Sequence, residues 1–174
     1  MPRRKQGFQA AAPAIGGKDG HEARRGTAGL FQGESNAINA QGESVMLKDL
    51  QVMPVLPAKD IDRAREFYRD KLGLEPTQTI DNDNLVYQCG NGTGFLLYRT
   101  DNAGSAKNTQ MGWGAEDVER EVEELRSRGV VFEEYDMPGL KTENGIATME
   151  GMGKGAWFLD SEGNILNISS IPVT

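Results

Sequence analysis

Residues 52–76 read VMPVLPAKDIDRAREFYRDKLGLEP, and this stretch predicts a short strand followed by an amphipathic helix. Pro54 and Pro57 keep the strand short, because proline cannot donate a ladder hydrogen bond and favours edges or bulges. Asp60 is a good N-cap, and the apolar residues that follow it recur at helical spacing until Gly73 supplies a stop.

The same pattern returns 57 positions later in the chain. Asp60-Ile61-Asp62-Arg63 is matched by Asp117-Val118-Glu119-Arg120, and both copies run into a glycine followed by an apolar residue (Gly73-Leu74 and Gly129-Val130). A fixed internal period of this size indicates one supersecondary unit used twice, so that each copy buries the apolar face of the other.

Short apolar runs between turn-rich segments complete each unit. The expected strands are 52–58, 77–80, 85–89 and 94–99 in the first unit, and 109–113, 130–134, 146–149, 156–159 and 165–171 in the second. Each unit is then β-α-β-β-β, with one further strand in the second, so the predicted fold class is α+β with two modules, about 50–104 and 105–174. One helix covers only one face of a module's sheet, and the inner face must close over side chains, a partner or a ligand.

The first 45 residues have a different composition. They are rich in glycine, alanine, glutamine and serine, contain only Phe8 and Phe31 as aromatics, and show no sustained period. Such a segment cannot bury enough apolar surface to offset its ordering entropy. We therefore expect a disordered N-terminal extension or leader over 1–45, with Met46 as a candidate start, and a single domain over 46–174. A regulatory or targeting arm is the alternative for residues 1–45.

Charge and cysteine content restrict the partners and the compartment. Residues 1–45 hold six basic and four acidic residues, which leaves a net −9 on the remainder of a chain whose net charge is −7. Nucleic-acid binding rests on clustered Lys and Arg, so this balance argues against it. The single cysteine, Cys89, cannot form an internal disulfide, which fits a reducing cytoplasm. No apolar run approaches membrane-spanning length.

Three segments carry a family resemblance: VMPVLPAKDIDRAREFYRDKLGLEP (52–76), QMGWGAEDVEREVEELRSRGVVFEEYDMPGLKTENGIA (110–147) and GAWFLDSEGNILNIS (155–169). Together they resemble the vicinal oxygen chelate superfamily, which contains glyoxalase I, extradiol dioxygenases, fosfomycin-inactivating enzymes and bleomycin-binding resistance proteins. The resemblance covers Leu50 to about Ser170. It implies a U-shaped cup made of two β-α-β-β-β modules, with the ligand on the concave side, and it makes a homodimer plausible.

Enzymes of this family hold a divalent metal in the cup, with ligands from the first and last strands of each module. Carried over by position, these sites fall on Met53, Leu97 or its neighbour Leu96, Gln110 and Asn167. A divalent ion favours carboxylate, imidazole or thiolate ligands, and this set offers none of them. The only histidine, His21, lies in the N-terminal segment. We therefore expect neither a metal nor another cofactor.

The same positions are candidates for ligand contact. Trp157 matches a position that often lines the family's pocket, where it could stack on a flat ligand, although a tryptophan can equally fill core space. Gln110 and Asn167 can be ordinary hydrogen-bonded amides, or they can orient a ligand's carbonyl or hydroxyl group. The predicted ligand-binding residues are Met53, Leu97, Gln110, Trp157 and Asn167, and no catalytic residue is assigned.

Other chemistry-bearing residues have less support. Trp113 is expected on the helix side of its strand or near the rim of the cup. The run from Glu133 to Asp136 is typical of a solvated face. Cys89 has no histidine nearby in the sequence to activate it as a nucleophile.

These observations favour a glyoxalase/bleomycin-resistance-like protein that binds a small apolar or aromatic molecule without a catalytic metal. The analogy is with resistance proteins that sequester a drug unaltered. Two alternatives stay open: a lyase, isomerase or dioxygenase of the same superfamily, which uses a metal or a metal-free mechanism, and a structural or interaction domain. An enzyme should lose turnover in Asn167→Ala or Gln110→Ala, whereas a structural domain should have a filled cup.

Overall fold

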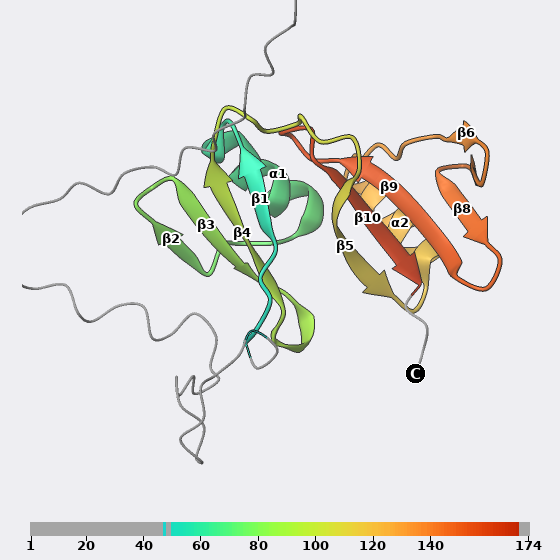
Figure 1. The fold of residues 1–174 in the computed structure, drawn as a ribbon, viewed down its shortest axis with the longest axis horizontal. Coiled ribbons are helices and arrows are strands. Elements are labelled where there is room, and N and C mark those ends of the chain that lie inside the picture. The colour runs from blue at the N-terminus through green and yellow to red at the C-terminus, as the bar shows by residue number, and fades with distance from the viewer. Residues whose placement is uncertain (1–46, 48–49, 171–174) are drawn as a thin grey trace, which may run out of the picture. The chain divides into compact units, whose positions relative to one another are not determined.

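The computed structural model describes residue 47 and residues 50–170 (Figure 1). The elements, in chain order, are β1 (Val55–Ala58), α1 (Ile61–Leu72), β2 (Gln78–Ile80), β3 (Asn84–Gln88), the short 3-10 helix η2 (Gly90–Gly92), β4 (Gly94–Arg99), β5 (Thr109–Ala115), α2 (Val118–Ser127), β6 (Asp136–Met137), β7 (Leu140–Glu143), β8 (Ile146–Met149), β9 (Gly153–Leu159) and β10 (Ile165–Ser170). The predicted disorder over 1–45 and the last residue of the predicted strand 165–171 lie outside the described residues.

The strands form two sheets, which confirms the predicted α+β fold class (Figure 1). The first sheet has the order β1-β4-β3-β2, and the second has the order β5-β10-β9-β8-β7-β6. In each sheet the strand that precedes the helix pairs in parallel with the last strand of the module, β1 with β4 and β5 with β10. Helix α1 packs against β3 and β4, and α2 packs against β9 and β10. Among the described residues, no helix has the length and apolarity needed to cross a bilayer.

The two helices begin in the same way. The side chain of Asp60 accepts a hydrogen bond from the backbone N–H of Arg63 at 3.0 Å, and that of Asp117 accepts one from the N–H of Arg120, also at 3.0 Å. Both aspartates are extended N-caps, at φ −120° and φ −129°. Each therefore satisfies a helical N–H that would otherwise lack a partner, as the sequence predicted.

The helix ends also correspond. Beyond α1, Gly73 has φ +69° and the N–H of Leu74 donates to Tyr68 O at 2.9 Å. Beyond α2, Gly129 has φ +80°, and the N–H of the next residue, Val130, donates to Leu125 O at 2.9 Å. A left-handed residue followed by this bond is the Schellman ending, which glycine adopts without a Cβ clash.

The core is centred on aromatic side chains that lie on the helix-facing sides of both sheets. Tyr87 and Phe95 are cross-strand partners stacked at 4.7 Å, and both contact Tyr68 of α1 at 5.3 Å. Trp113 meets the edge of Phe95 at 6.3 Å and stacks on Phe158 at 6.4 Å. Of the two positions expected for Trp113, the helix side of its strand or the rim, the structure shows the helix side. The aromatic contacts also join the two modules.

One predicted strand is wrong. Residues 130–134 contribute only an isolated bridge, between Phe132 and Phe158, and the hairpin β6–β7 follows instead. The carboxylate of Glu134 explains the departure, because it accepts hydrogen bonds from Thr142 Oγ1 at 2.6 Å and from the N–H of Gly145 at 2.7 Å. Contact with β9 therefore ends at Glu133, whose N–H donates to Trp157 O at 2.7 Å, and Glu134 is tied instead to β7 and to the β7–β8 turn. The run 133–136 is therefore partly structural.

Candidate ligand-binding face

Adjacent residues on β5, β9 and β10 point alternately to the two faces of the second sheet. Phe158 and Ile168 are buried in the core that contains α2 residues. Their neighbours Trp157 and Asn167 are direct cross-strand partners, and Asn167 also pairs with Gly112 on β5. These three residues share the face opposite α2, because successive side chains alternate along a strand. We call this the distal face.

Asn167 lies directly over Gly112. A Cβ built on Gly112 would be only 1.8 Å from Asn167 Oδ1 and 3.0 Å from its Cγ. The amide of Asn167 therefore occupies the space that a side chain at position 112 would need, and only glycine fits there. A glycine inside a strand often marks such a place, where another group approaches the backbone closely. The amide itself makes no side-chain hydrogen bond within the part of the chain that the structure describes, so its donor and acceptor are both available.

The indole of Trp157 is held from several sides. Its Nε1–H donates to Thr109 Oγ1 at 3.0 Å, across the intervening strand β10. Tyr135 meets the indole edge-on at 5.8 Å, and a Cβ on Gly155 would lie 3.0 Å from the Cη2 atom of the ring. Burial, and then the charge of Glu133, raise the pKa of Tyr135. The ring is therefore fixed by a hydrogen bond and an aromatic contact before any ligand arrives.

Gln110 occupies an irregular position next to this group. Thr109 pairs with Ile165 and Met111 pairs with Leu166, so Gln110 is the extra residue of a β-bulge. Its Oε1 atom is buried and has no hydrogen-bond partner among the described residues. Bulges re-aim side chains, and a buried acceptor without a donor is costly. A ligand donor would remove that cost.

The other two predicted residues belong to the first module, one beside its sheet and one within it. Met53 is half-buried and precedes β1, two positions before Val55, which pairs with Leu96. Leu97 is fully buried with Phe95 on the face toward α1, so its side chain is part of the core. Gln110, Trp157 and Asn167 are thus brought to neighbouring strands, whereas Met53 and Leu97 are not part of that group. The ligand contacts predicted for all five residues remain predictions.

The family's metal positions do not fit a divalent ion in this chain. They hold Met53, Leu96 or Leu97, Gln110 and Asn167, and either leucine is an aliphatic side chain without a ligand atom. None supplies a carboxylate, an imidazole or a thiolate. Within residues 50–170 no three His, Cys, Asp or Glu side chains gather in a way that could hold a metal.

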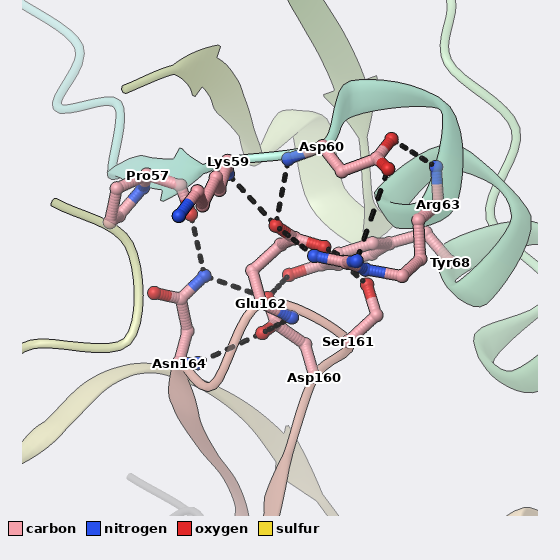
Figure 2. Close-up of polar contacts among 9 residues, drawn as sticks. All are labelled: Pro57, Lys59, Asp60, Arg63, Tyr68, Asp160, Ser161, Glu162 and Asn164. Carbon is pink, nitrogen blue, oxygen red and sulfur yellow. Dashed lines mark hydrogen bonds and ion pairs between the residues drawn. The ribbon is translucent and has the colours of Figure 1, made fainter. Parts of the chain in front are cut away.

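A second group of polar residues is more deeply buried. Asp160, Glu162 and Asn164, in the turn between β9 and β10, contact the beginning of α1 (Figure 2). Glu162 accepts from Arg63 Nε at 2.8 Å and from Arg63 Nη2 at 3.0 Å, and from the backbone N–H groups of Lys59 and Asp60 at 2.8 and 2.9 Å. A carboxylate in this position satisfies free N–H groups beside the positive end of a helix.

Asp160 completes this group. It accepts from Tyr68 Oη at 3.0 Å and from the side-chain Nδ2 of Asn164 at 2.8 Å, and Asn164 Nδ2 also donates to Pro57 O at 2.8 Å (Figure 2). We call Arg63, Tyr68, Asp160, Glu162 and Asn164 the inter-module cluster, because it joins the last hairpin to β1 and α1. Its hydrogen bonds link the hairpin to α1 and β1 as a structural joint, and Asn164 Oδ1 is its one buried polar atom without a partner among the described residues.

The charges of the cluster respond to this environment. Burial raises the pKa of Asp160 despite four hydrogen bonds that act against it. Burial also acts to raise the pKa of Glu162, but the hydrogen bonds from Arg63 and the backbone outweigh it and lower the pKa. Burial, followed by the charge of Asp160, raises the pKa of Tyr68 well above its ordinary value. Tyr68 therefore stays a neutral donor to Asp160.

Sequence reasoning missed the residues that support the distal face. The sequence predicts Thr109 only as the first residue of a strand and Tyr135 only as part of a solvated acidic run. It predicts no role for Gly112. The signal for Gly112 was present, since glycines at 112 and 114 interrupt a strand where they weaken pairing. The bond from Trp157 to Thr109 spans 48 positions and has no local signature.

Known proteins share this architecture. A bleomycin-binding protein solved in complex with bleomycin superposes with a TM-score of 0.55 at 18% identity, covering 71% of this chain and 99% of that chain. The fosfomycin resistance protein FosX from Listeria monocytogenes gives 0.53 at 13% identity, covering 71% and 92%. A glyoxalase/bleomycin resistance protein from Catenulispora acidiphila gives 0.50 at 23% identity, covering 71% and 99%. At these identities the likeness shows a common fold.

Sequence comparison identifies the family. No curated protein sequence matches the chain significantly. The family model of the Glyoxalase/Bleomycin resistance protein/Dioxygenase superfamily matches residues 50–168. The match spans both modules and includes Gly112, Trp157 and Asn167 of the distal face. The chain therefore belongs to the Glyoxalase/Bleomycin resistance protein/Dioxygenase superfamily.

Proposed function

We propose that this protein binds a small, largely apolar or aromatic molecule on the distal face, without a catalytic metal. One observation carries the proposal: the amide of Asn167 lies over Gly112 without a side-chain hydrogen bond among the described residues, beside the fixed indole of Trp157. The ring of Trp157 offers apolar contact to a ligand, and the amide of Asn167 offers a hydrogen bond that would orient it. Small-molecule sites combine these two features.

The side chains indicate what such a ligand should carry. A flat ring can stack on Trp157, and a good aromatic pair adds about 0.5–1.5 kcal/mol beyond area burial. The amide of Asn167 can accept or donate, whereas the buried Oε1 of Gln110 can only accept. The ligand class is therefore an aromatic or apolar molecule that bears at least one hydrogen-bond donor.

The structural relatives agree with small-molecule binding. One was solved with bleomycin bound, and another is a fosfomycin resistance protein. The metal-free part of the proposal rests on the donor set, since Met53, Leu97, Gln110 and Asn167 offer no negative charge to a divalent ion. Binding without turnover is therefore the function that these residues support best.

We also propose that the protein is a cytoplasmic homodimer without nucleic-acid or membrane partners. Val52 and Val55, just before and at the start of β1, are 91% and 51% exposed, which leaves an apolar edge available for a second copy. Val55→Asp should shift the sedimentation coefficient toward that of a monomer if this edge forms the contact. An unchanged oligomeric state would remove β1 from the interface.

A thermal-shift experiment tests the binding proposal. Tag-free protein is heated in chelator, then with Ni, Zn, Mn or Fe(II) added singly, and then with a library of aromatic molecules that carry donors. A ligand at about 100 times its dissociation constant stabilises by about 2.7 kcal/mol, several degrees for a domain of this size. We expect no specific response to a metal and a response to part of the library.

Variants then locate the site. Asn167→Ala and Gln110→Ala should each abolish most of the ligand-induced shift while the protein stays folded. Asn84→Ala and Gln78→Ala are matched controls, because both are half-buried amides on the first sheet. Equal shifts in all four variants would remove the distal face as the site. A tightly held, stoichiometric metal, or turnover of a library compound, would instead support the enzyme alternative.

A further inference from the structure

A concave site lies on the side of the second sheet that faces α2, opposite the distal face. A cavity of about 400 Å³ opens between the end of α1 and one side of α2. Its walls are apolar and come from both modules: Leu72, Leu74, Trp113, Leu125, Phe158 and Ile168. This volume and lining lie in the range of small-molecule sites. The sheet separates the cavity from Trp157 and Asn167, because Trp113 and Phe158 face α2 and their neighbours do not.

The wall residue Trp113 has an unused polar group. The N–H of Trp157 donates to Thr109, but the N–H of Trp113 finds no acceptor among residues 47 and 50–170. Its ring is only half-buried, although it stacks on the fully buried Phe158. This N–H is not among the buried polar atoms of the described residues, so solvent reaches it, and a ligand acceptor in the cavity can take the place of water on it.

The mouth of the cavity is acidic. Glu116, Arg120 and Glu121 line it, and Arg120 is already paired with Glu121 at 2.6 Å. Glu116 and Asp117 also act on the charge of Arg120, so three carboxylates surround a single guanidinium. Among the residues that line the cavity the balance is therefore negative, with two carboxylates against one guanidinium, and it favours a cationic group over an anionic one.

We infer that this cavity is a second ligand site, for a flat aromatic cation that carries a hydrogen-bond acceptor. The ring lies against Trp113 and Phe158, the acceptor takes the indole N–H of Trp113, and the cationic group lies at the mouth near Glu116. The inference does not rest on the proposed function of the distal face. Each face holds one of the chain's two tryptophans, so a single measurement distinguishes the two sites.

The test uses the full chain labelled with ¹⁵N and the two indole N–H resonances, assigned with Trp113→Phe and Trp157→Phe. The probe is 4-(aminomethyl)quinoline, which has a flat ring, an acceptor nitrogen and a cationic amine. We expect a saturable downfield shift of the Trp113 resonance while the Trp157 resonance stays in place. Movement of Trp157 alone, or of neither resonance at millimolar probe, would overturn the inference.

Two related probes test the chemistry. Quinoline-4-carboxylate carries the opposite charge and should bind at least about fivefold more weakly at the acidic mouth. 1-(Aminomethyl)naphthalene lacks the acceptor, so it should bind about fivefold more weakly and leave the Trp113 proton without its downfield shift. Equal affinity of the carboxylate would show that the mouth does not select charge.

Variants test the position of the cation. Glu116→Gln combined with Glu121→Gln should weaken binding of the cationic quinoline about two- to fivefold. Glu66→Gln combined with Glu123→Gln makes the same charge change on the helices outside the cavity lining, and should leave the affinity unchanged. Equal weakening by both pairs of substitutions would mean that the net charge of the protein, and not the carboxylates at the mouth, sets the affinity, and would contradict the placement of the cation. Ala115→Phe should fill the cavity and abolish binding. If Ala115→Phe does not fold, the Glu116→Gln and Glu121→Gln pair still decides the test.

Discussion

The carboxylate of Glu162 holds the guanidinium of Arg63 by two hydrogen bonds, at 2.8 and 3.0 Å, across 99 positions of sequence. The same carboxylate accepts the backbone N–H groups of Lys59 and Asp60, so one side chain of the last hairpin satisfies the beginning of α1. The hairpin strands β9 and β10 also carry Trp157 and Asn167. The joint between modules and the distal face are therefore parts of one hairpin.

Glu162→Ala should destabilise the protein by about 1.5–3 kcal/mol, because hydrogen bonds to a charged group are lost and two backbone N–H groups lose their acceptor. Urea denaturation measures the change. Glu124→Ala is the matched control, since Glu124 pairs with Arg128 at 2.7 Å on the exposed surface and should cost less than about 1 kcal/mol. Equal losses in the two variants would contradict a structural role for the inter-module cluster.

The two carboxyl groups of the cluster should give opposite pH dependences. The pKa of Glu162 is lowered from 4.5, so Glu162 stabilises the fold above that value, and this contribution is lost as the pH falls through the folded pKa. The pKa of Asp160 is raised from 3.8, so its contribution is present below that value and is lost as the pH rises through the folded pKa.

Glu162→Gln should therefore show a smaller loss of unfolding free energy than the wild type between about pH 6 and pH 3. Asp160→Asn should show a steeper rise in unfolding free energy toward neutral pH than the wild type, because the opposing contribution is gone. Denaturant titrations over this pH range measure both. Parallel pH profiles for the wild type and both variants would show that neither group is perturbed in the fold.

Gly112→Ala should displace the amide of Asn167, because the new Cβ would be 1.8 Å from Oδ1. We expect shifted side-chain NH₂ resonances of Asn167 and at least about a tenfold loss of affinity for any ligand of the distal face, the cost of an oriented hydrogen bond. Gly90→Ala is the control, since a Cβ there would meet nothing within 4 Å. An unmoved Asn167 signal in Gly112→Ala would contradict the arrangement.

A double-mutant cycle should detect the hydrogen bond from Trp157 to Thr109 as a coupling free energy between the two residues. Trp157→Phe and Thr109→Val each remove one partner, and each should cost about 0.5–1.5 kcal/mol of stability. The double variant should cost clearly less than the sum, because the same bond is removed twice. Additive costs would show that the bond contributes nothing to the fold.

The two helix caps should be close to equivalent. Asp60→Ala and Asp117→Ala each remove an acceptor for an N–H at 3.0 Å, so each should cost about 0.5–2 kcal/mol. Asp62→Ala is the control, since Asp62 is a neighbouring acid in the first turn of α1 that provides no cap. A cost confined to one of the two caps would argue against the equivalence of the two modules.

The sequence by itself determined the local structure of this protein. Asp60, Asp117, Gly73 and Gly129 set the beginnings and ends of both helices, because capping depends on residues within four positions of each other. Alternating apolar runs placed eight of the nine expected strands, since burial of one sheet face requires a period of two. The strand expected at 130–134 is reduced to contacts of Phe132 and Glu133 with β9, since the side chain of Glu134 bonds instead to Thr142 and Gly145.

Only the tertiary structure decided which residues meet. It separated Leu97, which packs under α1, from Gln110, Trp157 and Asn167, because strand register decides which face a residue occupies and a shift of one position reverses it. It also joined Glu162 to Arg63 and left the N–H of Trp113 without a partner among the described residues. These relationships depend on pairings between segments far apart in sequence, and no local pattern of residues specifies them.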